Sequence, residues 1–265
     1  MKKNDLVILD FSHVYPQDMG QQIREVQRID LSDIAGTNMY CTKEAEQEIR
    51  RRLDNLSPEG IHFLDNGNYH YVTKLFVEKI HHPFSLVLFD HHSDMQQPMI
   101  HDLLSCGSWA GELLRGNPWL QQLILVGPGA QSGKDIPRDL REKVVFISMQ
   151  EIEEDDMEEE IKKIRLDLPA YISIDKDVLD RYSARTNWNQ GTMSFETLER
   201  LLTDVFVSQH VIGVDICGEC DLSEPLGELV EDERINNSTN RLLYQFLASH
   251  LAQEGQEPCM RSEVM

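Results

Sequence analysis

The sequence predicts an α/β fold that is doubly wound around a mostly parallel sheet, and three observations support this. Short apolar runs alternate with amphipathic stretches along the whole chain, as strands and helices do in α/β proteins. The runs are apolar at nearly every position, which is typical of strands buried on both faces of a parallel sheet. Neither an internal repeat nor a Gly/Ser-rich linker interrupts the 265 residues, so we expect one domain over residues 1–265.

Each expected element follows from this pattern. Seven runs rich in Val, Ile, Leu and Phe are expected to form strands: residues 6–11, 61–64, 85–90, 122–126, 144–148, 171–175 and 211–216. Six stretches with an apolar face at helical spacing are expected to form helices: residues 43–53, 69–80, 109–114, 151–164, 194–208 and 236–252. Residues 253–265 are expected to form a flexible tail.

Charge and composition exclude several classes of partner. The chain has 25 Lys+Arg against 46 Asp+Glu, a formal net charge of −21, and this field repels nucleic acid while it suits divalent metals and cationic small molecules. No run reaches the roughly 18 apolar residues of a membrane helix, so no membrane partner is expected. Five cysteines, an odd number in a chain of this size, indicate reduced thiols, and we expect a cytoplasmic protein.

The strongest chemical signal follows the apolar run at residues 85–90. Asp90, His92 and Asp94 alternate there, so in an extended backbone their side chains point the same way. The carboxyl ends of strands are where open α/β sheets bind ligands. On its own, this motif could also be a turn with a capping residue.

Two further groups of residues extend this signal. Asp175 and Asp177 lie at the end of the run at residues 171–175, and His70 follows the run at residues 61–64. Four carboxylates at one sheet edge would repel one another unless cations lay among them. With two histidines, the set suits a pair of bridged divalent metals, and its many oxygen ligands favour manganese over a lone zinc.

These motifs resemble the arginase/agmatinase (ureohydrolase) family. The residues concerned are Gly67-Asn68-Tyr69-His70, Asp90-His91-His92-Ser93-Asp94 and the segment 173–180, against family patterns Gly-Gly-Asp-His-Ser, Asp-Ala-His-x-Asp and Ser-x-Asp-x-Asp-x-x-Asp-Pro. The resemblance covers about residues 61–250. It implies a three-layer α/β/α, arginase-like fold with a roughly eight-stranded sheet, two Mn²⁺ per chain and a small-molecule substrate.

The same resemblance implies a role for each metal ligand. One ion would be held by His70, Asp90, Asp94 and Asp175, and the other by Asp90, His92, Asp175 and Asp177, so that Asp90 and Asp175 bridge. Water shared by two cations ionises near neutral pH, and the resulting hydroxide would attack a guanidinium-type carbon. Asp94 would also orient this hydroxide and accept its proton.

The sequence departs from the family pattern where the substrate would be handled. Cys106 stands in the place of the family's proton-shuttle His, and a neutral thiol is the poorer acid. The family's guanidinium-holding Glu falls on Gly218, with Glu219 displaced by one position. Cys106 and Glu219 are therefore the candidate catalytic residues beside Asp94.

Two further segments are expected to lie near the site. The loop at residues 181–191 should overhang the metals, with Trp188 positioned for substrate contacts and Arg181 and Arg185 able to bind a carboxylate. Cys217 and Cys220 lack the second pair of ligands that a closed zinc site needs, so we expect thiols near the mouth of the site.

These observations favour a dinuclear manganese-dependent hydrolase of linear C–N bonds, most simply an amidinohydrolase acting on a guanidino compound. Two alternatives stay open: a deacetylase-like amide hydrolase on the same fold, and a metal-binding but catalytically quiet regulatory protein. The substrate is not identified by the sequence, and a homo-oligomer is compatible with it.

Overall fold

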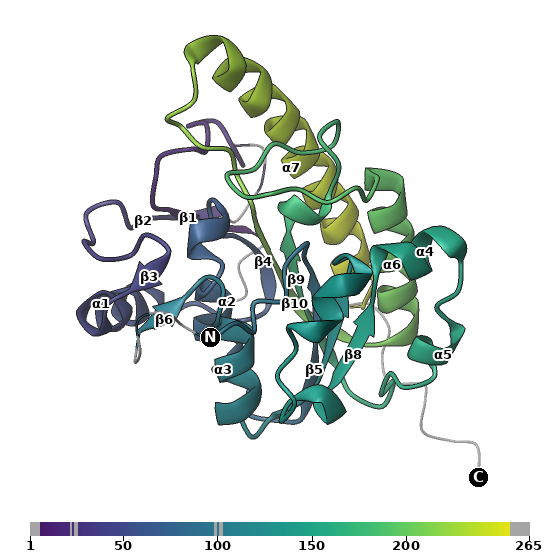
Figure 1. The fold of residues 1–265 in the computed structure, drawn as a ribbon. Helices are drawn as coiled ribbons and strands as arrows, with labels where there is room; N and C mark the ends of the chain where they lie inside the picture. Colours follow the sequence, from purple (N-terminus) through teal and green to yellow (C-terminus); the bar gives the residue numbers. More distant parts are fainter. Residues whose placement is uncertain (1–5, 22, 24–25, 98–99, 101–102, 255–265) are drawn as a thin grey trace.

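An eight-stranded sheet forms the centre of the computed structural model, which describes residues 6–21, 23, 26–97, 100 and 103–254 (Figure 1). The strand order is β2-β1-β4-β10-β9-β5-β7-β8, and all neighbouring strands pair in parallel. The strands are β1 (Leu6–Asp10), β2 (Val26–Asp30), β4 (Gly60–Phe63), β5 (Phe84–Phe89), β7 (Leu120–Val126), β8 (Val144–Ile147), β9 (Ala170–Asp175) and β10 (Val211–Cys217). A separate antiparallel pair joins β3 (Tyr40–Cys41) to β6 (Leu104–Ser105).

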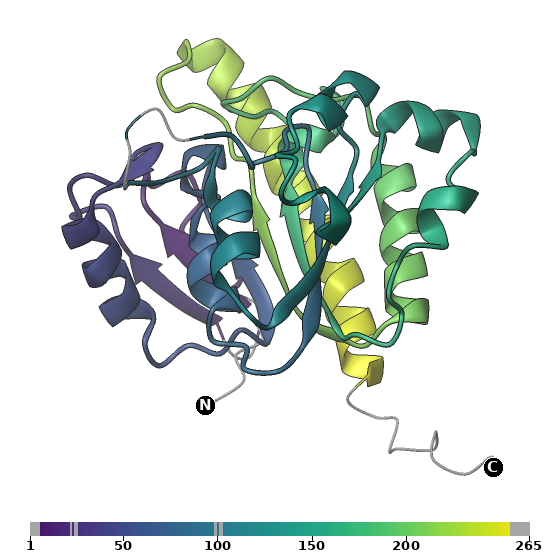
Figure 2. The same ribbon diagram turned by 60° about the horizontal axis from the view of Figure 1, so that its bottom comes forward.

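Helices cover both faces of the sheet and give a three-layer α/β/α arrangement (Figures 1 and 2). They are α1 (Lys43–Leu53), α2 (Val72–Val77), α3 (Trp109–Gly116), α4 (Met149–Glu154), α5 (Glu158–Ile161), α6 (Phe195–Ser208) and α7 (Leu226–Glu254). Helices α1 to α3 lie on one face, and α4, α6 and α7 lie on the other. The predicted fold class is confirmed.

Side-chain alternation along the strands builds the two cores. In β1, Val7 and Leu9 pack with α1 to α3, whereas Leu6 and Ile8 pack into the core beneath α6 and α7. Successive side chains of a strand point to opposite faces, so a strand between two helical layers must be apolar at consecutive positions. This is why the interior strands could be predicted from unbroken apolar runs.

Several predicted boundaries differ from the structure, for local reasons. The single helix expected over residues 151–164 is two helices, because Asp155 adopts a left-handed φ of 53° that ends α4. In place of a helix over residues 69–80, a 3-10 turn at Gly67–Tyr69 precedes α2. Helix α7 begins at Leu226 instead of residue 236. The edge strand β2 was not predicted, because its sequence is mostly polar and its side chains are at most half-buried.

Residues 253 and 254 continue α7, and the rest of the expected tail, residues 255–265, lies outside the described residues. Within the part of the chain that the structure describes, none of the helices combines the length and apolar character that a transmembrane segment needs.

Replacing His62 is expected to make the protein less sensitive to acid. This side chain is fully buried in β4 and stacks on Phe76, and burial lowers its pKa to about 3. The unfolded chain takes up a proton below pH 6.5 while the folded chain does not, so stability falls as pH falls. Between pH 6.5 and 5, protonation of His62 in the unfolded chain lowers the free energy of unfolding by about 2 kcal/mol.

The test is denaturant unfolding at pH 7 and pH 5 in the presence of a chelator. His62→Phe should lose about 2 kcal/mol less than the wild type over this interval. The matched control His82→Gln changes an exposed histidine and should follow the wild type. Equal losses in His62→Phe and the wild type would show that His62 does not titrate in this way.

Candidate metal centre

Four neighbouring strands in the middle of the sheet carry the candidate ligands. β4, β10, β9 and β5 are adjacent, and each is followed at its carboxyl end by acidic, histidine or cysteine side chains. The pairing Cys217↔Asp175 between β10 and β9 brings these two strand ends level, and Phe89↔Ile174 does the same one residue earlier for β5 and β9. Parallel pairing therefore gathers residues that are far apart in sequence at one edge.

The backbone turns after β9 and after β5, and in each turn one oxygen of the aspartate accepts a hydrogen bond from the backbone N–H two residues later. Asp175 Oδ1 accepts a hydrogen bond from the Asp177 backbone N–H at 2.9 Å, and Asp90 Oδ1 accepts from the His92 N–H at 2.5 Å. The other oxygen of each carboxylate stays available to the site. Asp94 adopts a left-handed φ of 50°, a strained conformation of the kind that clusters at functional sites.

His70 lies among three of the carboxylates. Its Nδ1 is 3.0 Å from Asp94 Oδ2, 3.3 Å from Asp90 Oδ2 and 3.5 Å from Asp175 Oδ2. Its other ring nitrogen, Nε2, is 2.9 Å from Ser173 Oγ, which donates to Asp215 at 2.5 Å. This second contact fixes the ring so that Nδ1 faces the carboxylates, as an outer partner does for a metal-binding histidine.

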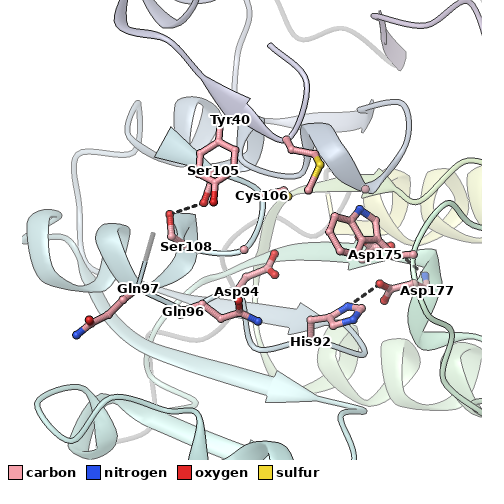
Figure 3. Close-up of a pocket in the computed structure, with 14 residues that line it drawn as sticks. Tyr40, His92, Asp94, Gln96, Gln97, Ser105, Cys106, Ser108, Asp175 and Asp177 are labelled. Carbon is pink, nitrogen blue, oxygen red and sulfur yellow. Dashed lines mark hydrogen bonds and ion pairs between the residues drawn. The ribbon is translucent and has the colours of Figure 1, made fainter. Parts of the chain in front are cut away.

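His92 forms the second half of the cluster. Its Nδ1 is 2.8 Å from Asp177 Oδ2 (Figure 3). The same atom is 3.6 Å from Asp90 Oδ1. Asp90 therefore lies between the two histidines, with Oδ2 toward His70 and Oδ1 toward His92. Of the two carboxylates expected to bridge, Asp90 has this placement, whereas Asp175 groups with His70.

The pKa values show that these charges are forced together. Burial and the charge of Asp90 raise the pKa of Asp94 to about 6, and they raise the pKa of Asp175 as well. Burial and the charge of Asp175 raise the pKa of Asp177 well above its usual range. Burial opposes the charge of His92, but Asp177 and Asp90 outweigh it and raise its pKa to about 11.

The residues present fit a pair of divalent ions. Two buried ligand atoms, His70 Nδ1 and Asp90 Oδ2, make no hydrogen bond within the described residues, which is unusual for buried polar atoms. Two groups of candidate ligands, His70–Asp90–Asp94 and Asp90–His92–Asp177, share Asp90, and a third consists of His70, Asp175 and Cys217. The structure thus brings together all six ligands that the sequence predicted.

A pocket of about 220 Å³ opens onto these ligands (Figure 3). His92, Asp94, Asp175 and Asp177 form its floor. Among the described residues, its remaining lining is uncharged: Met39, Tyr40, Gly67, Gln96, Gln97, Ser105, Cys106, Gly107, Ser108 and Trp188. The predicted placement of Cys106 and Trp188 beside the site agrees with this lining.

Three residues expected near the substrate lie elsewhere. Glu219 is buried and pairs with Lys176 Nζ at 2.5 Å, and it does not line this pocket. Arg181 and Arg185 line a separate, acidic pocket, where Arg185 pairs with Asp232 at 3.1 Å.

The arrangement is that of an α/β protein with a cluster of metal ligands at the carboxyl edge of its sheet, and comparison places it in a known family. The model of the arginase family matches residues 6–219. The chain belongs to the arginase family, whose members are hydrolases of C–N bonds in linear amidines.

Similar proteins agree with this assignment. An uncharacterized protein from Thermotoga maritima is 32% identical over 242 residues, covering 89% of this chain and 88% of the relative. A hypothetical agmatinase from Burkholderia thailandensis has a TM-score of 0.65 at 16% identity, covering 96% of this chain and 88% of that one. The formimidoylglutamase from Bacillus subtilis has a TM-score of 0.64 at 17% identity, covering 98% and 89%. These structural similarities concern the fold.

The position of Cys217 among the candidate ligands was not predicted from the sequence. Its Sγ is 3.2 Å from Asp175 Oδ2, deep beside the ligands and not at the mouth of the site. The signal was present, because Cys217 follows directly on an apolar run just as Asp90 does. Tyr40 and Ser108 carried no such signal, since the small β3–β6 pair that brings their segments together was not predicted.

Metal binding is expected to raise the melting temperature. A divalent ion relieves the repulsion among buried carboxylates, and an ion present at 100 times its dissociation constant adds about 2.7 kcal/mol. For a chain of this size, this corresponds to an increase of about 5–10 °C. Calorimetry of chelated protein, with Mn²⁺ or Zn²⁺ added back, measures the shift.

Asp90→Asn should abolish most of this shift, because Asp90 belongs to both groups of ligands. The control Asp139→Asn removes a carboxylate that is exposed and pairs with Arg115, and it should keep the full shift. If neither metal moved the melting temperature of the wild type, the carboxylates would not form a metal site.

Proposed function

We propose that the chain is a hydrolase that uses two divalent metal ions to cleave a linear C–N bond in a small amidine or guanidino compound. The observation that carries the proposal is the cluster of six candidate ligands, four of which line a pocket large enough for a small molecule. His70, Asp90, Asp94 and Asp175 would hold one ion, and Asp90, His92, Asp175 and Asp177 the other. When bound, the ions would activate water and polarise the carbon under attack.

The metal nearer His92 is proposed to be Mn²⁺. Its nearest candidate ligands, apart from the imidazole, are the carboxylates of Asp90 and Asp177. Carboxylate-rich sites suit Mn²⁺ better than they suit softer ions. Together with the position beside His70, this gives two divalent ions per chain.

Asp94 is proposed to accept the proton of the attacking water. It lines the pocket, and a carboxylate held beside the reacting atoms can act as a general base. The indole N–H of Trp109 donates to Asp94 Oδ2 at 2.6 Å, which orients the carboxylate and leaves Oδ1 for the proton.

Cys106 is proposed to shape the pocket wall and not to act as a nucleophile. Burial and the charge of Asp94 raise the pKa of its thiol to about 12. A thiol in this state is not ionised at neutral pH, and the thiolate is the reactive form. In contrast to the family's shuttle His, Cys106 would therefore contribute little to proton transfer.

The substrate is proposed to be small and to have an uncharged end away from the metals. The family's guanidinium-holding Glu would fall on Gly218, which has a φ of +92°. A Cβ there would lie 2.5 Å from Asp175 Oδ1, so no side chain fits. Because the described part of the pocket wall is uncharged, hydrogen bonds from Tyr40 and the side-chain amide of Gln96 are contacts that it offers to a substrate.

A pocket whose described wall is uncharged also suits an amide, and this keeps a deacetylase-like hydrolase as the second candidate. Such a substrate requires no acidic group to hold a guanidinium. A catalytically quiet protein would bind the same metals without turnover, and the experiment below separates the three functions.

The test is a product screen with purified protein loaded with Mn²⁺, with Zn²⁺ and with both. Guanidino compounds, formimino compounds and short-chain amides are supplied, and urea, ammonia, formamide and carboxylate products are measured. We expect turnover on guanidino or formimino compounds with a neutral tail, and loss of at least 100-fold in Asp94→Asn. Turnover on amides alone would favour the second candidate, and none on any class would contradict the proposal.

Placing a side chain at position 218 is expected to damage the site. Gly218→Ala introduces left-handed strain of about 1–3 kcal/mol and a clash with Asp175. Thermal unfolding and metal titration should show lower stability and weaker metal binding. Gly218→Glu, which reproduces the family residue, should be worse still and should not confer activity on arginine.

Gly129→Ala is the matched control, because a Cβ at Gly129 meets no atom within 4 Å. It should behave like the wild type. Wild-type stability and metal affinity in Gly218→Ala would show that this turn tolerates a side chain, and the argument for an uncharged substrate end would then fail.

A further inference from the structure

Cys217 occupies a position that the family-derived ligand set leaves out. It is the last residue of β10, fully buried, and it pairs in register with Asp175 of β9. The backbone turns immediately afterwards at Gly218, whose lack of a side chain lets the turn pack against Asp175. The chain thus holds a thiol at the same sheet edge as the carboxylates.

The contacts of this thiol are those of a ligand. Cys217 Sγ donates to Asp175 Oδ2 at 3.2 Å, the same oxygen that lies 3.5 Å from His70 Nδ1. The three ligand atoms of His70, Asp175 and Cys217 lie within 4.8 Å of one another. His70 Nδ1, almost fully buried, makes no hydrogen bond within the described residues, which independently indicates that it faces a ligand.

We propose that Cys217 is a direct metal ligand, which gives the ion beside His70 a sulfur donor. This inference rests on the metal centre of the proposed function and adds a residue to it. Binding breaks the S–H bond and forms a metal–sulfur bond, and the thiol proton passes to solvent. The cation then replaces the thiol proton as the positive charge between the sulfur and Asp175.

A sulfur ligand makes the two metal positions chemically different. Thiolates select softer ions such as Zn²⁺, Fe²⁺ or Co²⁺, whereas carboxylates accept Mn²⁺. His70, Asp175 and Cys217 form a mixed nitrogen, oxygen and sulfur site, while Asp90, His92 and Asp177 offer oxygen beside one imidazole. The centre is therefore suited to two different metals, with the softer ion beside His70.

The other described cysteines do not share this arrangement. Cys106 lines the pocket but belongs to none of the ligand groups found among the described residues. Cys220 is buried beside the acidic pocket that Arg185 lines, away from the ligands. Both serve as matched controls, because each is a buried free thiol that belongs to none of the ligand groups containing His70 and Asp175.

The experiment uses Co²⁺ as a spectroscopic probe of the full chain. Cobalt bound by a thiolate shows an intense sulfur-to-metal charge-transfer band in the near ultraviolet, whereas cobalt bound by nitrogen and oxygen alone does not. We expect this band in the wild type, in Cys106→Ser and in Cys220→Ser, and its loss in Cys217→Ser. Elemental analysis of the same samples gives the number of ions bound.

X-ray absorption of the zinc-loaded protein provides a second readout. A Zn–S distance of about 2.3 Å is expected in the wild type and should be absent in Cys217→Asp, which replaces sulfur by an oxygen ligand. Cys217→Asp also guards against a variant that fails only because it does not fold. Competition between Mn²⁺ and Zn²⁺ should shift toward Mn²⁺ in this variant.

The outcomes separate the two proposals. Two bound ions without the charge-transfer band would overturn the role of Cys217 and leave the metal centre standing. Absence of any bound ion would overturn the metal centre itself. If the band persisted in Cys217→Ser and disappeared in Cys106→Ser, the sulfur ligand would be Cys106. This result would also contradict the proposal.

Discussion

Repulsion among buried carboxylates at the carboxyl edge of the sheet is the constraint on which the rest of the structure depends. Asp90, Asp94, Asp175 and Asp177 are nearly or fully buried, and burial together with the charges of neighbouring carboxylates raises the pKa values of Asp94, Asp175 and Asp177. Burial of unpaired charge is costly, so such a group persists only where something compensates it. Backbone N–H groups and the two histidines compensate part of the charge, and the proposed pair of divalent ions would compensate the remainder.

The fold supplies the rigidity that this crowding requires. Four adjacent parallel strands deliver the ligands, and each is fixed on both sides by hydrogen-bonded neighbours and above and below by helices. The buried pair of Lys176 and Glu219, joined by Asn240 of α7, ties the turns after β9 and β10 to the outer helical layer. Removing one partner of such a pair leaves a buried charge without compensation and is therefore costly. We infer that this pair stabilises the turns that carry the site.

Much of the fold and the metal centre could be predicted because the signals are local. Buried parallel strands are continuous apolar runs, and alternating Asp and His after such a run place their side chains together. Elements without such a signal were missed: β2 is a polar edge strand, and the break between α4 and α5 depends on the left-handed conformation of Asp155. Glu219 and Cys217 flank Gly218, but sequence alone does not tell which of them faces the site, because the turn at Gly218 decides this.

The central claim, that these six side chains hold two metal ions, is tested most directly by anomalous diffraction. Crystals of the chain grown with both Mn²⁺ and Zn²⁺ would be measured at the absorption edge of each metal. The account predicts two anomalous peaks, one against His70 and Asp94 and the other against His92 and Asp177, both in contact with Asp90. A single peak, or none, with all six side chains ordered in the electron density would contradict it.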